Sequence, residues 1–173
     1  MNAPLYPFNS EKFEEVILYL LVHAPKQTIS GKKKLAKLLY FADFNYFEAF
    51  EEPITGATYR ALPMGPVPKE LESTLAKLEG KKVTILKKSI GLENDICVYK
   101  LAEEPNALDF SKLSSKEKKV LDKVIKDYGH LPGKALENIT HAEAPYCATA
   151  PGEYIHYELA FYRGKTKEQL VGA

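Results

Sequence analysis

The sequence predicts an α+β fold that is mainly α: a helical domain with a small antiparallel β-hairpin or sheet. In several segments of the 173-residue chain, apolar residues recur every three to four positions, the spacing of one helix face. Two short segments near positions 83 and 98 instead alternate apolar and polar residues, as the strands of a hairpin do. We expect one domain over residues 1–163 and a polar, flexible tail over 164–173.

Two helices open the chain. Helical spacing predicts the first over residues 11–23, with Asn9 or Ser10 as its cap, and the second over 31–50, with Ser30 as its cap. The second helix is apolar on two opposite faces, so it is either buried from both sides or covers a partner with its second face. The sequence leaves both interpretations open. The second face carries three aromatic residues, Tyr40, Phe44 and Phe47.

The middle of the chain is predicted to contain a loop, a third helix and the hairpin. Residues 53–68 contain four prolines and two glycines, which predicts a loop with at most a short strand at 57–62. A helix follows, and Pro68 suits its first turn. The alternating segments then form the two strands, joined by a loop over 88–95.

The C-terminal half is predicted to be helical. Ser114 and Glu117 have the spacing of a capping box at the start of a fourth helix, and Gly129 is expected to end that helix in the left-handed conformation. A short helix is expected over 132–140, and another is expected to begin near His156.

Charge and composition exclude several classes of protein. The chain has 24 Lys plus Arg and 23 Asp plus Glu, and its net charge of +1 removes the broad attraction to nucleic acid or anionic lipid. No run of about eighteen apolar residues predicts a membrane-spanning helix. The N-terminus lacks the features of a secretory signal. We therefore expect a cytoplasmic protein with no membrane partner.

The sequence offers no catalytic motif, and we predict a protein that is not an enzyme and needs no metal or cofactor. A nucleophile elbow, a glycine-rich phosphate loop and a paired aspartate motif are all missing. His141 and Glu143, with His130 and His156, are the one group of candidate ligands, and their spacing is not that of a metal site. We interpret His141 as bonding to the carbonyls at a helix end. A metal-dependent hydrolase around it is a competing hypothesis.

Three consecutive lysines, Lys32, Lys33 and Lys34, open the second helix, where the helix dipole disfavours cations. Local physics does not explain their placement. They form either a solvated face or a basic patch for an acidic partner or a phosphate backbone.

A series of motifs resembles the SocA-like antitoxin family, whose domain is also called Panacea and is of the phage-associated protein type. In order, the motifs are KLAKLLYFAD at 34–43, PITG at 53–56, YRA at 59–61, MGPV at 64–67 and LENITH at 136–141, followed by Glu143 and Pro145. Together they span most of the chain. The family often has a tryptophan after that proline, where this chain has Tyr146.

The resemblance implies an antitoxin that neutralises a cognate toxin by direct protein–protein binding. We expect the partner to contact the second face of the second helix and parts of the turn after it, through Tyr40, Phe44, Phe47, Lys37, Tyr59 and Met64. Structural roles are expected for five motif residues, Gly65, Pro66, Val67, His141 and Pro145.

Two alternative functions stay open. In the first, the chain is a proteolytic adaptor that delivers a toxin to a AAA+ protease, with the tail as a protease contact. In the second, it is a winged-helix-like DNA-binding regulator, because a helix followed by a hairpin is similar to that module. Glu70 and Glu72 near the start of the third helix would then face phosphates, so we do not expect a nucleic-acid partner.

Overall fold

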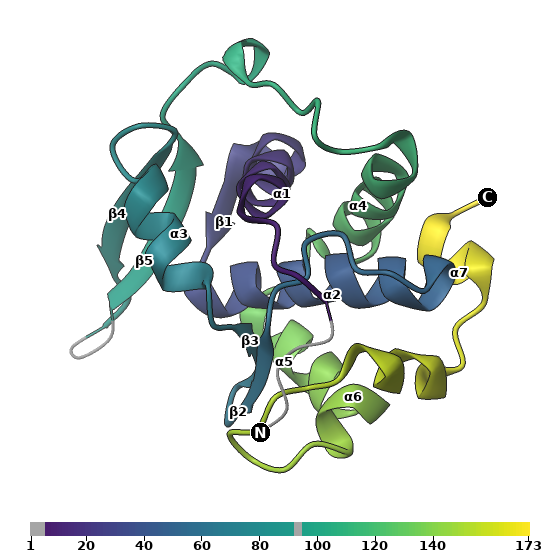
Figure 1. The fold of residues 1–173 in the computed structure, drawn as a ribbon. Coiled ribbons are helices and arrows are strands. Elements are labelled where there is room, and N and C mark those ends of the chain that lie inside the picture. The colour runs from purple at the N-terminus through teal and green to yellow at the C-terminus, as the bar shows by residue number, and fades with distance from the viewer. Residues whose placement is uncertain (1–5, 92–94) are drawn as a thin grey trace.

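The computed structural model describes residues 6–91 and 95–173. It confirms the predicted fold class, which is α+β and mainly α (Figure 1). The helices are α1 (Ser10–His23), η1 (Pro25–Gln27), α2 (Lys32–Phe50), α3 (Leu71–Leu78), η2 (Pro105–Ala107), α4 (Ser115–Tyr128), α5 (Gly133–His141), α6 (Ala144–Cys147), η3 (Tyr157–Arg163) and α7 (Lys167–Val171). The strands are β1 (Thr28–Ser30), β2 (Tyr59–Leu62), β3 (Gly65–Pro68), β4 (Val83–Ser89) and β5 (Asp95–Leu101).

Helix α2 runs through the centre of the fold, and the other elements surround it (Figure 1). Every residue from Leu35 to Phe47 is buried. Helices α4, α5 and α7, the segment η3 and the strand β3 all pack against it. Of the two interpretations of its double apolar surface, burial from both sides is therefore the one the structure adopts. The second face meets η3, where Tyr157 stacks on Phe44 and Phe47 with ring centroids 4.7 and 5.4 Å apart.

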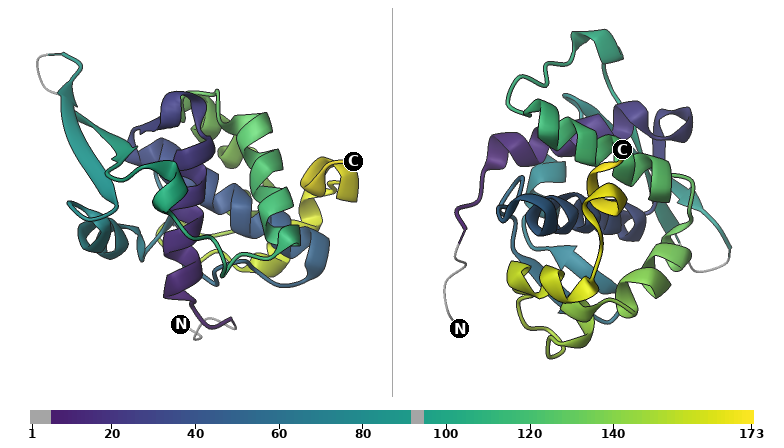
Figure 2. Two further views of the ribbon diagram at one scale, coloured as in Figure 1. Left: turned by 90° about the horizontal axis from the view of Figure 1, so that it is seen from above. Right: turned by 90° about the vertical axis from the view of Figure 1, so that its right-hand side faces the viewer.

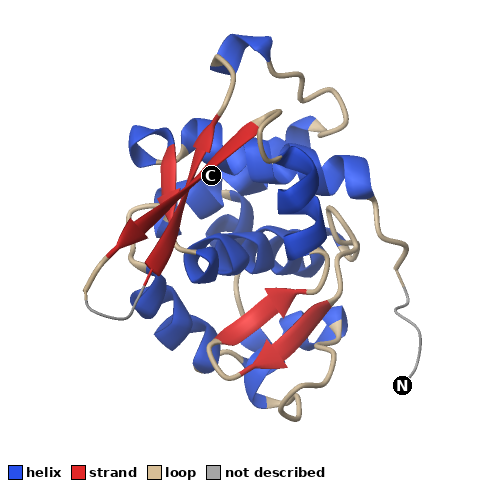
Figure 3. Cartoon of the chain, turned by 90° about the vertical axis from the view of Figure 1, so that its left-hand side faces the viewer, coloured by secondary structure: helices blue, strands red, loops and turns tan. Residues whose placement is uncertain are grey.

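The strands form two separate antiparallel sheets (Figure 3). One has the order β1-β5-β4, and Tyr99 of β5 lies opposite both Ile29 and Ile85. The β4–β5 hairpin extends away from the helices (Figure 2). The other sheet pairs β2 with β3, so that Arg60 lies opposite Val67. Part of the predicted loop between β4 and β5, residues 92–94, lies outside the described residues.

Two strands were not predicted from the sequence. Strand β1 has only three residues, too few to show a period. Strand β3 contains Pro66 and Pro68, which lack a backbone N–H and are tolerated at a sheet edge. Pro68 therefore ends a strand, and α3 starts later, at Leu71.

The helix ends confirm some predictions and correct others. Asn9 caps α1 by accepting from Lys12 N at 3.0 Å, and Ser114 with Glu117 forms the predicted capping box on α4. The predicted Ser30 cap on α2 is wrong, because Ser30 belongs to β1 and Gly31 occupies the cap position. Gly129 has a right-handed φ of −59° rather than the predicted left-handed conformation.

The segment 164–173, which the sequence predicts to be a polar, flexible tail, contains a helix that packs on the domain. These residues include α7, which starts with a capping box between Thr166 and Gln169 and packs against α2 and α4. Leu170 anchors the helix with 1% of its surface exposed. Leu170 and its neighbour Val171 are adjacent apolar side chains in a polar segment and give no periodic signal, so only packing reveals the helix. Within the described residues, no helix combines the length and hydropathy needed to cross a bilayer.

Candidate functional site

Two of the family-like motifs, at 34–43 and 64–67, contribute to a groove between the first turns of α2 and the β2–β3 hairpin. The groove has a volume of about 320 Å³. Its lining consists of Lys32, Lys33, Ala36 and Lys37 from α2 and Leu62, Pro63, Met64 and Val67 from the hairpin. The apolar residues of both walls face the same space, and Met64, with 57% of its surface exposed, stands at the turn of the hairpin.

Lys37 connects the two walls of this groove. Its side chain is fully buried, and its Nζ donates to the carbonyl oxygen of Pro66 at 3.0 Å. Burial lowers the pKa of Lys37 to about 8, because the charged amine loses water. Lys37, the second lysine of the first motif, thus holds the Gly-Pro-Val turn in place.

Gly65 is fixed as glycine by this contact. Its φ of +101° is a conformation that residues with a Cβ rarely adopt. A Cβ at this position would also lie 2.5 Å from Lys37 Cε and 2.9 Å from Thr140 Oγ1. Backbone conformation and close packing therefore both require glycine here.

The three lysines that open α2 each have a tertiary partner. Lys32 forms an ion pair with Glu72, and Lys33 lies 2.5 Å from Glu137. Lys34 donates to the carbonyl oxygen of Gly129 at the end of α4, at 2.6 Å. These contacts explain a placement that the helix dipole alone disfavours. The hydrogen bond from Lys33, supported by Lys134, lowers the pKa of Glu137 to about 2.

Asp43 holds the loop that leads into the hairpin. Its buried carboxylate accepts from Thr55 N at 2.7 Å, from Thr55 Oγ1 at 2.5 Å and from Tyr59 Oη at 2.6 Å. Burial raises the pKa of Asp43 to about 6, although the hydrogen bonds from Thr55 and Tyr59 oppose the shift. The motifs at 34–43, 53–56 and 59–61 therefore build one hydrogen-bonded unit.

A buried ionic cluster, consisting of Glu48, Glu143, Arg163 and Lys165, joins the C-terminal segment to α2. Arg163 pairs with Glu48 at 2.8 Å and with Glu143 at 3.2 Å. Glu143 also pairs with Lys165 at 2.8 Å and accepts from Tyr40 Oη at 2.8 Å. The sequence analysis missed this cluster. In the sequence, these charged residues stand next to apolar segments. A sequence pattern does not show which of them form ion pairs with one another.

Most of the predicted partner-binding residues are not at the surface. Five of the six are buried, namely Lys37, Tyr40, Phe44, Phe47 and Tyr59. Tyr59 donates to Leu39 O and to Asp43, and the aromatic residues of α2 pack against η3. Because η3 and the hairpin cover the second face, these five side chains do not present the surface that direct partner contact would need. Met64 has the exposure that partner binding requires.

His141 and Pro145 lie beside the hairpin. The His141 ring stacks on Tyr146 with centroids 4.5 Å apart, and among the described residues its buried Nε2 has no hydrogen-bond partner. The predicted bond to helix-end carbonyls is thus not made by Nε2. Tyr146, which follows the buried Pro145, donates to Leu62 O at 2.8 Å. Tyr146 therefore ties the α6 segment to the end of β2.

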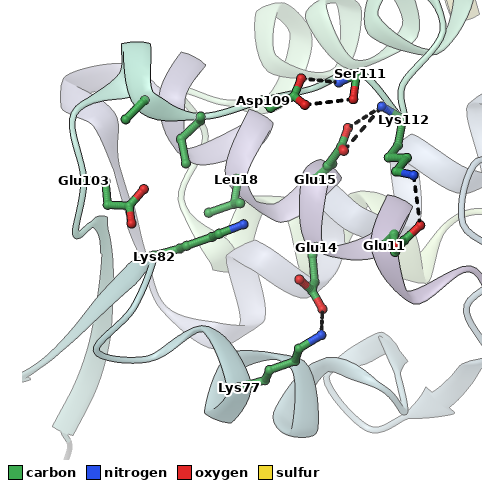
Figure 4. A pocket seen from close by; sticks show the side chains of 12 residues that line it. Glu11, Glu14, Glu15, Leu18, Lys77, Lys82, Glu103, Asp109, Ser111 and Lys112 are labelled. Atoms are coloured by element: carbon green, nitrogen blue, oxygen red, sulfur yellow. Dashed lines mark hydrogen bonds and ion pairs between the residues drawn. The ribbon is translucent and has the colours of Figure 1, made fainter.

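A second pocket, of about 340 Å³, has a mixed charged lining (Figure 4). Its charged groups largely satisfy one another, since Glu14 pairs with Lys77, Glu11 pairs with Lys112 and Glu15 accepts from the backbone of Lys112. Across residues 6–91 and 95–173, no group of three or more His, Cys, Asp or Glu side chains is placed to hold a metal ion. We take the groove as the candidate site because its lining joins residues of two family-like motifs.

Comparison with known proteins agrees with the motifs. A family model described as "Antitoxin SocA-like, Panacea domain" matches residues 35–146. The match begins within α2 and ends at Tyr146, so it contains the hairpin wall of the groove and two of the four helix-wall residues, Ala36 and Lys37. No curated protein and no solved structure matches the chain.

Proposed function

Because the chain belongs to the antitoxin SocA-like family with the Panacea domain, we propose that it neutralises a cognate toxin by direct protein–protein binding. The family suggests a role in a toxin–antitoxin pair. Direct binding is the mechanism that we add to this role.

One observation carries the proposal: the matched residues form a hydrogen-bonded frame that positions the hairpin wall of the groove. Lys37 bonds to Pro66 O, Asp43 bonds to Thr55, and Tyr146 bonds to Leu62 O. A frame whose shape is fixed before binding loses little conformational entropy when a partner docks. Such a frame suits a protein that acts by presenting a surface.

The toxin is proposed to contact the rim of this frame around Met64. The aromatic residues of α2 and Tyr59 then act indirectly, because their burial positions the hairpin. Exposed methionine is common at surfaces that bind partners of varied shape, since its side chain is flexible and polarizable.

Co-expression tests the proposal. The neighbouring reading frame is expressed alone and together with this protein, growth is recorded, and the pair is co-purified. We expect growth to stop with the neighbour alone, to be restored by co-expression, and a stable complex to be recovered. Rescue with a falling level of the neighbouring protein and no stable complex would favour the proteolytic adaptor. Absence of both toxicity and complex would contradict the antitoxin function.

A further inference from the structure

We infer that the groove between α2 and the β2–β3 hairpin receives a segment of the toxin in which an apolar side chain is flanked by carboxylates. The inference rests on the proposed antitoxin function and specifies the chemistry of the bound segment. It differs from the sequence hypothesis, which placed the contact on aromatic residues that are buried.

The size and lining of the groove fit an apolar side chain. Its volume of about 320 Å³ is at the lower end of the range for ligand pockets, so it suits one or two side chains rather than a large cofactor. Ala36, Leu62, Pro63, Met64 and Val67 supply apolar contacts from both walls. Burying an apolar side chain there removes its surface and part of the exposed Met64 surface from water.

The charge of the groove fits carboxylates beside that apolar side chain. Every charged residue of its lining is a lysine, namely Lys32, Lys33 and Lys37. The carboxylates that pair with Lys32 and Lys33 belong to Glu72 and Glu137, which lie outside the lining. The N-terminus of α2 adds a partial positive charge at the same end. Glu72 and Glu137 offset part of this charge, but the side chains of Lys32 and Lys33 stay 44% and 29% exposed. A flanking carboxylate on the toxin can therefore still pair with them, whereas a lysine would be repelled.

The hairpin wall is held firmly enough to act as a preformed surface. Ala61 donates to Glu153 O at 3.0 Å, and Gly152 donates to Ala61 O at 2.7 Å. With the bonds from Lys37 and Tyr146, the hairpin is fixed on several sides. The apolar lining and the chain's net charge of +1 favour a protein segment over nucleic acid.

A pair of substitutions of opposite charge tests the inference. Met64→Glu and Met64→Lys both remove the apolar contact and both change an exposed side chain, so neither is expected to disturb folding. Ile90→Glu is the matched control, because Ile90 is 61% exposed and follows β4, outside the groove. Each variant is purified, its thermal melting is compared with the wild type, and its affinity for the purified toxin is measured at two salt concentrations.

We expect Met64→Glu to weaken binding by about tenfold or more, because the new carboxylate occupies the lysines and repels the toxin. Met64→Lys should bind at least about threefold more tightly than Met64→Glu, and that difference should shrink at high salt. Ile90→Glu should bind like the wild type.

Three outcomes overturn the inference while leaving the antitoxin function intact. They are wild-type affinity in both Met64 variants, an equal loss in both, and a larger loss in Met64→Lys. Growth rescue and toxin binding by the wild-type protein distinguish a failure of this inference from a failure of the proposed function. If the wild type neither rescues growth nor binds the neighbouring protein, the antitoxin function itself is wrong, and the groove inference fails with it.

Discussion

At the scale of the residue, one contact explains why the Gly-Pro-Val turn has its sequence. Lys37 is fully buried and reaches the Pro66 carbonyl by passing close to Gly65. A buried amine is costly unless it is hydrogen-bonded, so the turn must keep its carbonyl within reach. The side chain predicted to touch a partner instead sets the position of the wall that the partner would touch.

We expect Gly65→Ala to lower the free energy of unfolding by about 2 kcal/mol or more, because strain at positive φ adds to a clash with Lys37 and Thr140. Gly80→Ala is the control, since Gly80 also has a positive φ, of +74°, but nothing lies within 4 Å of its Cβ position. It should cost only about 1 kcal/mol. Urea denaturation measures both, and equal losses would contradict the packing role of Gly65.

At the scale of the element, α7 illustrates how a short helix is held by one buried side chain and by the ion pairs of the chain just before it. It has five residues, too few to be stable alone, and docks through Leu170 onto α2 and α4. Arg163 and Lys165 hold the chain just before it through the buried ionic cluster. Deleting residues 164–173 would therefore expose the core. A loss of activity after this deletion would reflect lost stability as well as any lost protease contact.

Leu170→Ala should lower the free energy of unfolding by about 2–3 kcal/mol, because it removes a buried side chain and leaves a cavity. Leu86→Ala, at a side chain of β4 that is half exposed, should cost less than about 1 kcal/mol. Thermal melting of both variants gives the comparison. A loss at Leu170 no larger than that at Leu86 would mean that α7 contributes little to stability and is detached in solution.

At the scale of the whole molecule, α2 is the element on which the rest of the fold is assembled. The hairpin, the loop before it and the C-terminal segment each attach through a buried polar group of this helix: Lys37, Asp43 and Tyr40, respectively. These groups lie among aromatic and aliphatic side chains, where an unmatched polar atom costs about 1–3 kcal/mol. Because so few arrangements satisfy all of them, they favour one arrangement of the surrounding elements.

We expect Glu143→Gln to lower the free energy of unfolding at pH 7 by about 2–4 kcal/mol, because it leaves Arg163 and Lys165 buried with less opposite charge. Burial opposes ionisation of Glu143, but Arg163 and Lys165 outweigh it and hold its pKa below the ordinary 4.5. Its stabilisation is therefore present above pH 4.5 and is lost as the pH falls through the lower pKa of the folded state.

Urea denaturation at several pH values down to 3 checks this expectation. The wild type should lose its advantage over Glu143→Gln as the pH falls, because the native carboxylate takes up a proton. Glu153→Gln, at an exposed carboxylate, is the control and should follow the wild type at every pH. A difference between wild type and Glu143→Gln that does not change with pH would contradict the role given to the charge of Glu143.

The sequence by itself determined the longer helices, the main hairpin, the capping box at Ser114 and the family. These features depend on the spacing of residues that are close in the sequence, and this spacing is the same however the elements pack. Only the tertiary structure decided that both faces of α2 are buried, that the lysines at its start have partners, and that the last residues dock through Leu170. Each of these depends on side chains far apart in the sequence, and a periodic pattern records which residues are apolar but not what covers them.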